Sequence, residues 1–147
     1  MEHNFPAVEF RNQYHQARVN ILQTYSWIKT QVKNILDSFD ITTQQFSILL
    51  ILQEQFPTPI STLDIREKML DRHSDTSRIV DRMIAKGWVE KTGNTVDRRK
   101  VNIILTNTGR DLLNRIAEKN DELDGILDNL SITETEKLNT LLEKIRN

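Results

Sequence analysis

Hydroxyl and guanidinium side chains recur on one face of a short segment near the middle of the chain. Within residues 74–86 the apolar side chains follow helical spacing and would turn inward: Ile79, Val80, Met83 and Ile84. The outward positions are then Ser74, Ser77, Arg78, Asp81 and Arg82. Hydroxyl and guanidinium groups donate hydrogen bonds to base edges and phosphates, and a helix N-terminus itself favours phosphate. Taken alone, the set is more typical of a solvated, salt-bridged helix face.

A second cationic group follows between two segments rich in β-branched residues. WVEKTG and VNIILT predict two short strands, and NTVDRRK between them predicts the loop of a hairpin. A guanidinium group suits a narrow, electronegative minor groove, so we expect Arg98 to project while Asp97 pairs with Arg99 to fix the loop. The tip then carries Arg98, Arg99 and Lys100 as candidate DNA contacts. The alternative is an ordinary polar turn.

Charge is distributed unevenly along the chain. The net charge is −1, yet residues 61–100 hold ten Lys and Arg against seven Asp and Glu, a balance of +3. The flanks are acidic, with four against five in residues 1–60 and six against nine in residues 101–147. A basic centre between acidic flanks indicates localised contact with an anion.

Composition excludes several classes of protein. A chain of 147 residues is about one domain, and four glycines and three prolines predict a strongly helical fold rather than a sandwich or barrel. The absence of cysteine excludes disulfides and thiolate metal sites. Apolar runs are too short for a membrane span and the polar N-terminus has no signal-peptide core, so a cytoplasmic location is expected.

Catalysis has little support in the sequence. The three histidines, His3, His15 and His73, are far apart, and neither a metalloprotease HExxH nor a phosphate-binding GxxxxGK[ST] is present. His73, Ser74 and Asp75 are adjacent, and neighbouring helix positions point apart, so they cannot form a triad locally. His15 with acidic residues could hold a metal, although a surface or interface histidine is more usual. We therefore predict a non-enzyme without metal or cofactor.

Six helices and one hairpin are expected around these groups. An apolar stripe from Phe10 to Phe39 predicts a first helix of about thirty residues, over roughly 7–37. Further helices are predicted to open at Thr42 with Gln45, at Ser61 or Thr62, at Ser74, at Thr106 or Thr108, and at Thr133 with Glu136. The fifth of the six would run unbroken through Leu130. Gly87 is expected as a left-handed C-cap of the fourth.

These elements predict a mainly α fold with a small β-hairpin wing. Residues 38–108 would form a winged helix-turn-helix lobe, in which the second short helix enters the major groove. Residues 7–37 and 109–146 would form long terminal helices of the same 1–147 domain. Their apolar stripes exceed what one small core can cover, so we expect them to build an obligate homodimer.

The stretch from Pro59 to Leu113 resembles the MarR family of bacterial transcriptional regulators. The resemblance rests on TSRIVDRMIAKGWVEK, the DRR at 97–99 and LTNTG at 105–109. It implies a homodimer that binds a pseudo-palindromic operator and commonly represses transcription until a small ligand or stress signal releases it. By position, Arg78 and Ser77 match the recognition helix, and Asp97, Arg98 and Arg99 match the wing.

Three departures from the family pattern stand out. The segment Leu70 to His73 lacks the glycine often seen before the recognition helix, and Arg66 occupies a position where a small residue is usual. Without cysteine, the thiol-oxidation mechanism of some relatives is excluded.

Two further expectations concern ligands and the alternative function. A cleft is expected where the first helix meets the second and fifth, with an apolar or phenolic effector held by Tyr14, Tyr25 and Trp27. Aromatic residues at helical spacing are, however, more often plain core. The alternative function is a winged-helix protein-interaction module that never touches DNA, which the cationic wing argues against.

Overall fold

The computed structural model describes residues 9–93, 96 and 101–147. Its elements, in chain order, are α1 (Gln13–Asp37), α2 (Thr43–Gln55), β1 (Ile60–Ser61), α3 (Thr62–Lys68), α4 (Thr76–Ala85), β2 (Val89–Gly93), β3 (Val101–Leu105), α5 (Asn107–Ala117), α6 (Asn120–Asp124), the 3-10 turn η1 (Gly125–Leu127) and α7 (Ile132–Arg146). This confirms a mainly helical winged-helix fold. No helix among these residues is both long and apolar enough to cross a bilayer.

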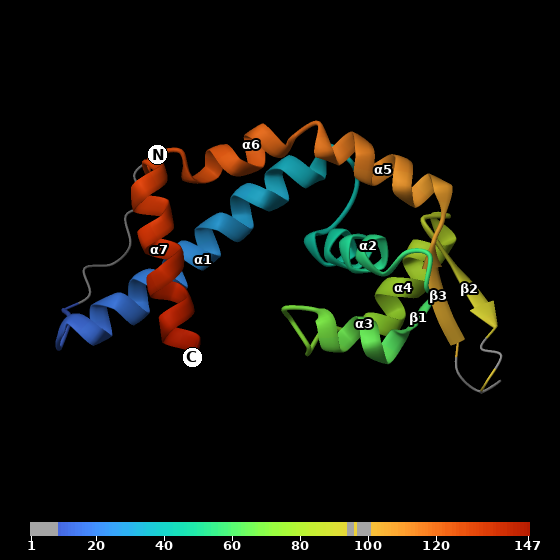
Figure 1. The fold of residues 1–147 in the computed structure, drawn as a ribbon, viewed down its shortest axis with the longest axis horizontal. Coiled ribbons are helices and arrows are strands. Elements are labelled where there is room, and N and C mark those ends of the chain that lie inside the picture. The colour runs from blue at the N-terminus through green and yellow to red at the C-terminus, as the bar shows by residue number, and fades with distance from the viewer. Residues whose placement is uncertain (1–8, 94–95, 97–100) are drawn as a thin grey trace.

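The elements divide between a lobe and a set of terminal helices. α2, α3, α4 and the sheet gather into the lobe, while α1, α6 and α7 extend away from it (Figure 1). α5 leads out of the sheet toward α6, which contacts α1. The buried core belongs chiefly to the lobe, and its fully buried side chains include Ile48, Leu49, Ile65, Met83, Ile103 and Leu112. Of α1, only Leu36 is buried.

Three antiparallel strands form the sheet, in the order β1-β3-β2. The predicted hairpin is confirmed, with Val89 opposite Leu105 and Gly93 opposite Val101. β1 was not predicted from the sequence, because two residues carry no readable alternation; Ile60 pairs with Ile103.

Side-chain caps set most helix starts. The Thr42–Gln45 capping box is confirmed, and of the two candidates for α3 it is Ser61 that caps, together with Asp64. The predicted start of the first helix near residue 7 is wrong for the described residues 9–12, which are not helical. The Asn12 side chain accepts a hydrogen bond from the His15 backbone N–H at 2.9 Å and so starts α1 at Gln13.

The C-terminal region differs most from expectation. The single fifth helix through Leu130 is wrong: α5, capped by Thr106, ends at Ala117, and the backbone then tightens as the Lys119 N–H bonds to the Ile116 carbonyl at 2.9 Å. The predicted Thr133–Glu136 box is also wrong, because Ser131 and Glu134 cap α7 instead.

The Ser131–Glu134 box is electrostatically tuned. Hydrogen bonds from the Ser131 backbone N–H and hydroxyl hold the pKa of the Glu134 carboxyl below its ordinary value. These hydrogen bonds favour the ionised carboxylate, which is why the pKa is lowered. The stabilisation that they give to α7 is therefore present at neutral pH and is lost as pH falls through the folded-state pKa.

Two glycines permit the junction between α4 and α5. Gly87 follows α4 with a φ of +74°, which confirms the expected left-handed cap. Gly109 lies in the first turn of α5 against the Trp88 carbonyl, and an added Cβ would stand 2.1 Å from that oxygen. The Thr106 N–H donates to the same carbonyl at 3.1 Å. α5 therefore starts in direct backbone contact with the turn that ends α4.

We predict that Gly109→Ala destabilises the fold. The new methyl group meets backbone rather than a movable side chain, so the free energy of unfolding should fall by about 1 to 3 kcal/mol. Gly125→Ala is the matched control, because a Cβ there has nothing within 4 Å and the residue already has helical φ. Urea unfolding followed by circular dichroism measures both; equal stability of the two variants would contradict the close contact.

Candidate nucleic-acid interface

The start of α4 is set by Asp75 rather than by Ser74. The Asp75 carboxylate accepts the Arg78 backbone N–H at 3.2 Å, so the helix begins at Thr76, two residues later than predicted. Ser74 lies in the preceding turn, where its hydroxyl donates to the Asp71 carbonyl at 2.9 Å. Its position beside the helix N-terminus is thus fixed by the turn.

One face of α4 is buried and the opposite face is free. Thr76, Val80 and Met83 are buried, with Ile79 and Ile84 packed at the edge of the core. The exposed positions are Ser77, Arg78, Asp81, Arg82 and Ala85. The helix therefore presents a hydroxyl and two guanidinium groups together, with Ser74 next to its first turn.

Carboxylates on α4 hold neighbouring cations. Arg78 Nε lies 3.5 Å from the Asp75 carboxylate, and its side chain stays 73% exposed. Asp81 pairs with Lys91 of β2 at 3.4 Å. Exposed pairs contribute little to stability. The Asp81 pair connects α4 to β2, and Arg78 stays largely exposed although it is paired with Asp75.

Arg66 joins this surface and was missed as a site residue by the sequence analysis. Ile65 of α3 is buried, which turns the next residue outward. Arg66 lines a hollow of about 250 Å³ at the α4 N-terminus, together with Thr62, Leu63 and residues 74–77. The sequence held a clue to this role, because Arg66 occupies a position at which the family pattern usually has a small residue. A cation beside hydroxyls at a helix N-terminus favours phosphate.

The wing tip lies mostly outside the described residues. Asp97, Arg98, Arg99 and Lys100 belong to that part, and their predicted roles stay predictions. Next to them, Val96 is 95% exposed, and the paired strand ends Gly93 and Val101 bring both sides of the loop together.

The predicted aromatic trio is not brought together in one pocket. Tyr25 lines a pocket of about 360 Å³ whose walls come from α1, α2 and the turn after α3: Ile28, Lys29, Val32, Thr43, Gln44, Ser47, Met69, Leu70 and Asp71. Tyr14, 88% exposed, and half-buried Trp27 are not among its lining residues. The third wall is the turn after α3, not the fifth helix as expected, because α5 begins beside Trp88.

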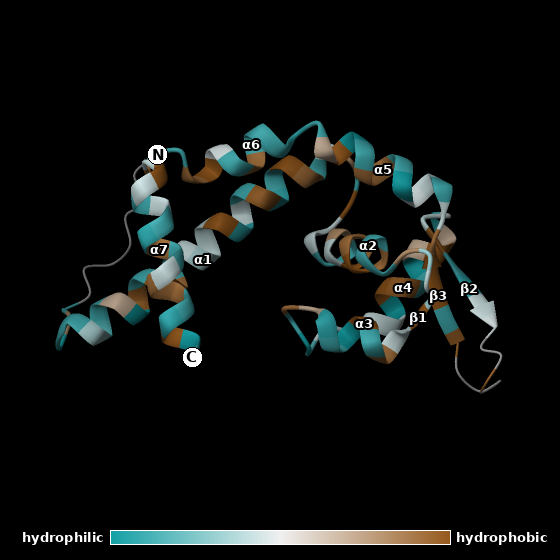
Figure 2. Ribbon diagram, in the orientation of Figure 1, coloured by the Kyte–Doolittle hydropathy of each residue, from teal (hydrophilic) through white to brown (hydrophobic). Residues whose placement is uncertain are grey.

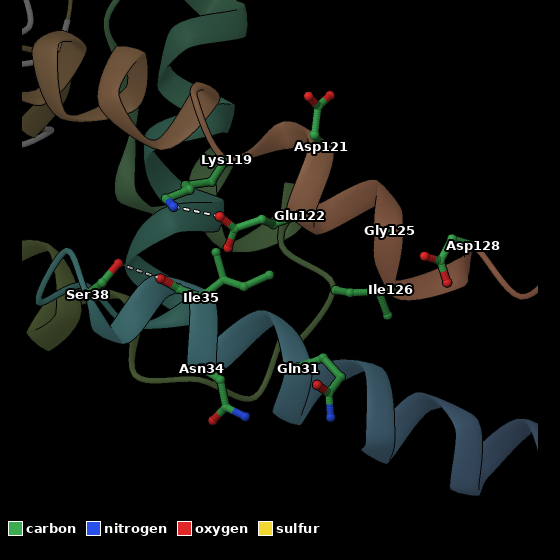
Figure 3. Close-up of a pocket in the computed structure, with 10 residues that line it drawn as sticks. All are labelled: Gln31, Asn34, Ile35, Ser38, Lys119, Asp121, Glu122, Gly125, Ile126 and Asp128. Carbon is green, nitrogen blue, oxygen red and sulfur yellow. Dashed lines mark hydrogen bonds and ion pairs between the residues drawn. The ribbon is translucent and has the colours of Figure 1, made fainter.

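A second hollow, of about 670 Å³, separates α1 from α6 (Figure 3). Its walls mix polar and apolar groups: Gln31, Asn34 and Ser38 come from α1 and the residue after it, Ile35 and Ile126 add apolar surface, and Lys119 is paired with Glu122 on the other side. No group of three or more metal-binding side chains occurs among the described residues.

Comparisons with known proteins agree with this geometry. The model of the MarR family matches residues 41–101. The chain is similar to the HTH-type transcriptional regulator PecS of Dickeya dadantii, with 29% identity over 131 residues, 88% of this chain and 76% of that protein.

Solved structures share the fold. A mutant MarR from Escherichia coli in complex with operator DNA is 24% identical, with a TM-score of 0.82 over 94% of this chain and 99% of that one. Bordetella bronchiseptica BpsR, whose structure concerns regulation of DNA binding by 6-hydroxynicotinic acid, is 21% identical with a TM-score of 0.77 over 90% of this chain and 99% of that one. Residues 41–101 therefore form a MarR-family domain, and the chain as a whole is similar to the transcriptional regulator PecS and shares the fold of MarR.

Proposed function

We propose that the chain is a sequence-specific DNA-binding repressor that binds a pseudo-palindromic operator as a homodimer and is released by a small ligand. The observation that carries the proposal is the exposed face of α4, where Ser77, Arg78 and Arg82 lie together opposite a buried apolar face. A helix so anchored can enter the major groove without exposing its core side.

The chemistry of that face matches duplex DNA. A guanidinium group donates two parallel hydrogen bonds to guanine O6 and N7, while serine hydroxyls bond to bases or phosphates. Arg66 and Ser74, at the N-terminus of α4, suit the adjoining phosphates. The wing residues Arg98, Arg99 and Lys100 would extend the contact into the minor groove, with Asp97 holding the loop. A regulator of this kind acts on cytoplasmic DNA.

The terminal helices supply the argument for a dimer. α7 buries none of its residues, and apolar residues alternate with polar ones along α1 and α7 (Figure 2). Large apolar side chains of these helices are exposed in the single chain: Tyr14, Ile21, Leu22, Ile132, Leu141 and Ile145. A second copy would cover them, and obligate interfaces of this kind bury roughly 2,000 to 5,000 Å².

The pocket at Tyr25 is the proposed effector site. Its volume of about 360 Å³ lies within the range of small-molecule sites, and its walls join α1 to the DNA-binding lobe. A small aromatic or lipophilic ligand there would act by binding one arrangement of lobe and α1 better than another. The BpsR structure, which concerns control by an aromatic acid, supports this ligand class.

DNA selection from random duplexes tests the central proposal. The selected site should be a pseudo-palindrome with half-sites about one helical turn, ~34 Å, apart. Arg78→Ala should weaken binding by about 1 to 3 kcal/mol and relax base preference at one position of each half-site. Arg115→Ala, which removes an exposed arginine of α5, is the matched control and should bind as the wild type does.

Salt dependence separates this function from a protein-interaction module. Affinity for the selected duplex should fall steeply as salt rises, because bound cations release counterions from the phosphates. The proposal would be contradicted if the protein selects no sequence, if it does not bind duplex DNA, or if binding does not depend on salt. Wild-type affinity in both Arg78→Ala and Arg98→Ala would also contradict it.

Assembly should depend on α7. Sedimentation at low micromolar concentration should give a dimer for the full chain, and a monomer for Leu141→Asp or for a chain that lacks residues 132–147. The reason is that a carboxylate or a missing helix leaves the apolar side chains of α1 uncovered. Leu50→Asp places the same change on an exposed apolar residue of α2 and should remain dimeric. A stable wild-type monomer would contradict the dimer.

Effector release should depend on Tyr25. A panel of aromatic carboxylates titrated into the protein–operator complex should contain a compound that weakens DNA binding at least tenfold, equivalent to about 1.4 kcal/mol of coupling. Tyr25→Ala should reduce that compound's affinity, whereas Tyr14→Ala, an aromatic change outside the pocket, should not. If compounds bind in the pocket and none of them changes the affinity for DNA, the proposal of ligand-driven release is contradicted.

A further inference from the structure

We propose that Lys86 is a positioning residue that sets the orientation of the recognition helix α4 relative to the long helix α1. The residue directly follows α4, and its side chain reaches back to the turn that joins α1 to α2. The effect of Lys86 on the distance between α1 and α4 can be measured without DNA. Its effect on the choice of operator rests on the function proposed above.

The contact joins two segments 46 residues apart in the chain. Lys86 Nζ donates a hydrogen bond to the Asp40 backbone carbonyl at 2.8 Å and lies 3.0 Å from the Asp40 carboxylate. The same ammonium group lies 4.5 Å from the centre of the Trp88 ring. The Asp40 carboxylate is 97% exposed, so the ion pair alone is weak, and the carbonyl and the ring give the contact its geometry.

Asp40 is held in a conformation that aims its carbonyl at Lys86. Its φ of 52° lies in the left-handed region, which is strained for a residue with a side chain. The turn is fixed by hydrogen bonds from the Phe39 N–H to the Leu36 carbonyl and from the Asp40 N–H to the Asp37 carbonyl. Leu36 and Ile41, on either side, are buried. Strain that the surroundings enforce in this way marks a position with a role.

The start of α5 contacts the same short segment, residues 86–88, that carries Lys86. The Thr106 hydroxyl donates to the Gly87 carbonyl at 2.7 Å, and Gly109 packs against the Trp88 carbonyl. Residues 86–88 are thus contacted by the turn after α1 and by the start of α5. The approach of Gly109 to the Trp88 carbonyl is backbone against backbone, whereas the Lys86 contact depends on a flexible side chain. Lys86 is therefore an adjustable link between the turn after α1 and the end of α4.

Removal of this link should free the angle between α1 and α4 without altering the DNA-facing side chains. The group that would be lost lies beyond the C-terminal end of α4, whereas Ser77 and Arg78 lie in its first turn. In a dimer, the spacing of the two recognition helices depends on that angle. A variant without the link should therefore lose preference for one half-site spacing while each half-site is still read.

Distance measurement between spin labels tests the link directly. The chain has no cysteine, so Thr24→Cys on α1 and Ser77→Cys on α4, both at exposed positions, give two unique labels. Labelled protein diluted with an excess of unlabelled protein reports the distance within one chain. We expect a narrow distribution for this labelled background, and a broader or shifted one when Lys86→Met is added.

Lys33→Met is the matched control, because it removes the same charge from an exposed pair, Lys33–Asp37, that stays within α1. It should leave the distribution unchanged. Methionine keeps the aliphatic stem that covers Trp88, so we expect Lys86→Met to fold. Thermal melting followed by circular dichroism checks this. If Lys86→Met does not fold, Lys86→Gln replaces it. A Lys86 variant with the narrow distribution of the labelled background overturns the proposal.

Unlabelled protein on DNA provides the second readout. The wild type should prefer the selected site over one whose half-sites are moved by roughly 5 base pairs, half a helical turn, and Lys86→Met should lose this preference. A uniform loss on every duplex, with a reduced salt slope, would instead make Lys86 a phosphate contact and overturn the proposal. If the wild type binds no duplex, the proposed function fails, while the label distances still decide the role of Lys86.

Discussion

The close approach of Gly109 to the Trp88 carbonyl is the constraint on which the junction between the lobe and the C-terminal helices depends. It leaves no room for a side chain at 109, and the Thr106 N–H closes on the same carbonyl. This contact fixes how the start of α5 lies against the turn that ends α4. Because α5 leads to α6 and then to α7, this contact sets the direction in which the C-terminal helices leave the lobe (Figure 1).

Burial is divided unequally between the lobe and the terminal helices. The lobe around α2, α3 and α4 closes its own core, which allows α4 to keep its cationic face in solvent. α1 and α7 contribute almost nothing to that core, so their apolar side chains remain available for a second copy. The Tyr25 pocket lies on the boundary between the two regions, with walls from both.

The sequence predicted correctly those features that depend only on neighbouring residues. The Thr42–Gln45 box, the left-handed Gly87 and the inward face of α4 each follow from a few neighbouring residues, and the structure confirms them. Competing caps were misjudged where two fitted the pattern: Asp75 displaced Ser74, and Ser131 displaced Thr133. Long-range features could not be predicted. The bend after α5, the third wall of the pocket and the place of Arg66 beside α4 all depend on tertiary packing that no sequence period encodes.

Amide hydrogen exchange with and without the selected duplex tests the central claim, that α4 is the surface that meets DNA. The proposal predicts slower exchange on DNA binding in peptides that cover residues 71–82, with little change in peptides from α2, which is not proposed to contact DNA. Protection confined to other segments, with exchange at 71–82 unchanged in a saturated complex, would contradict it.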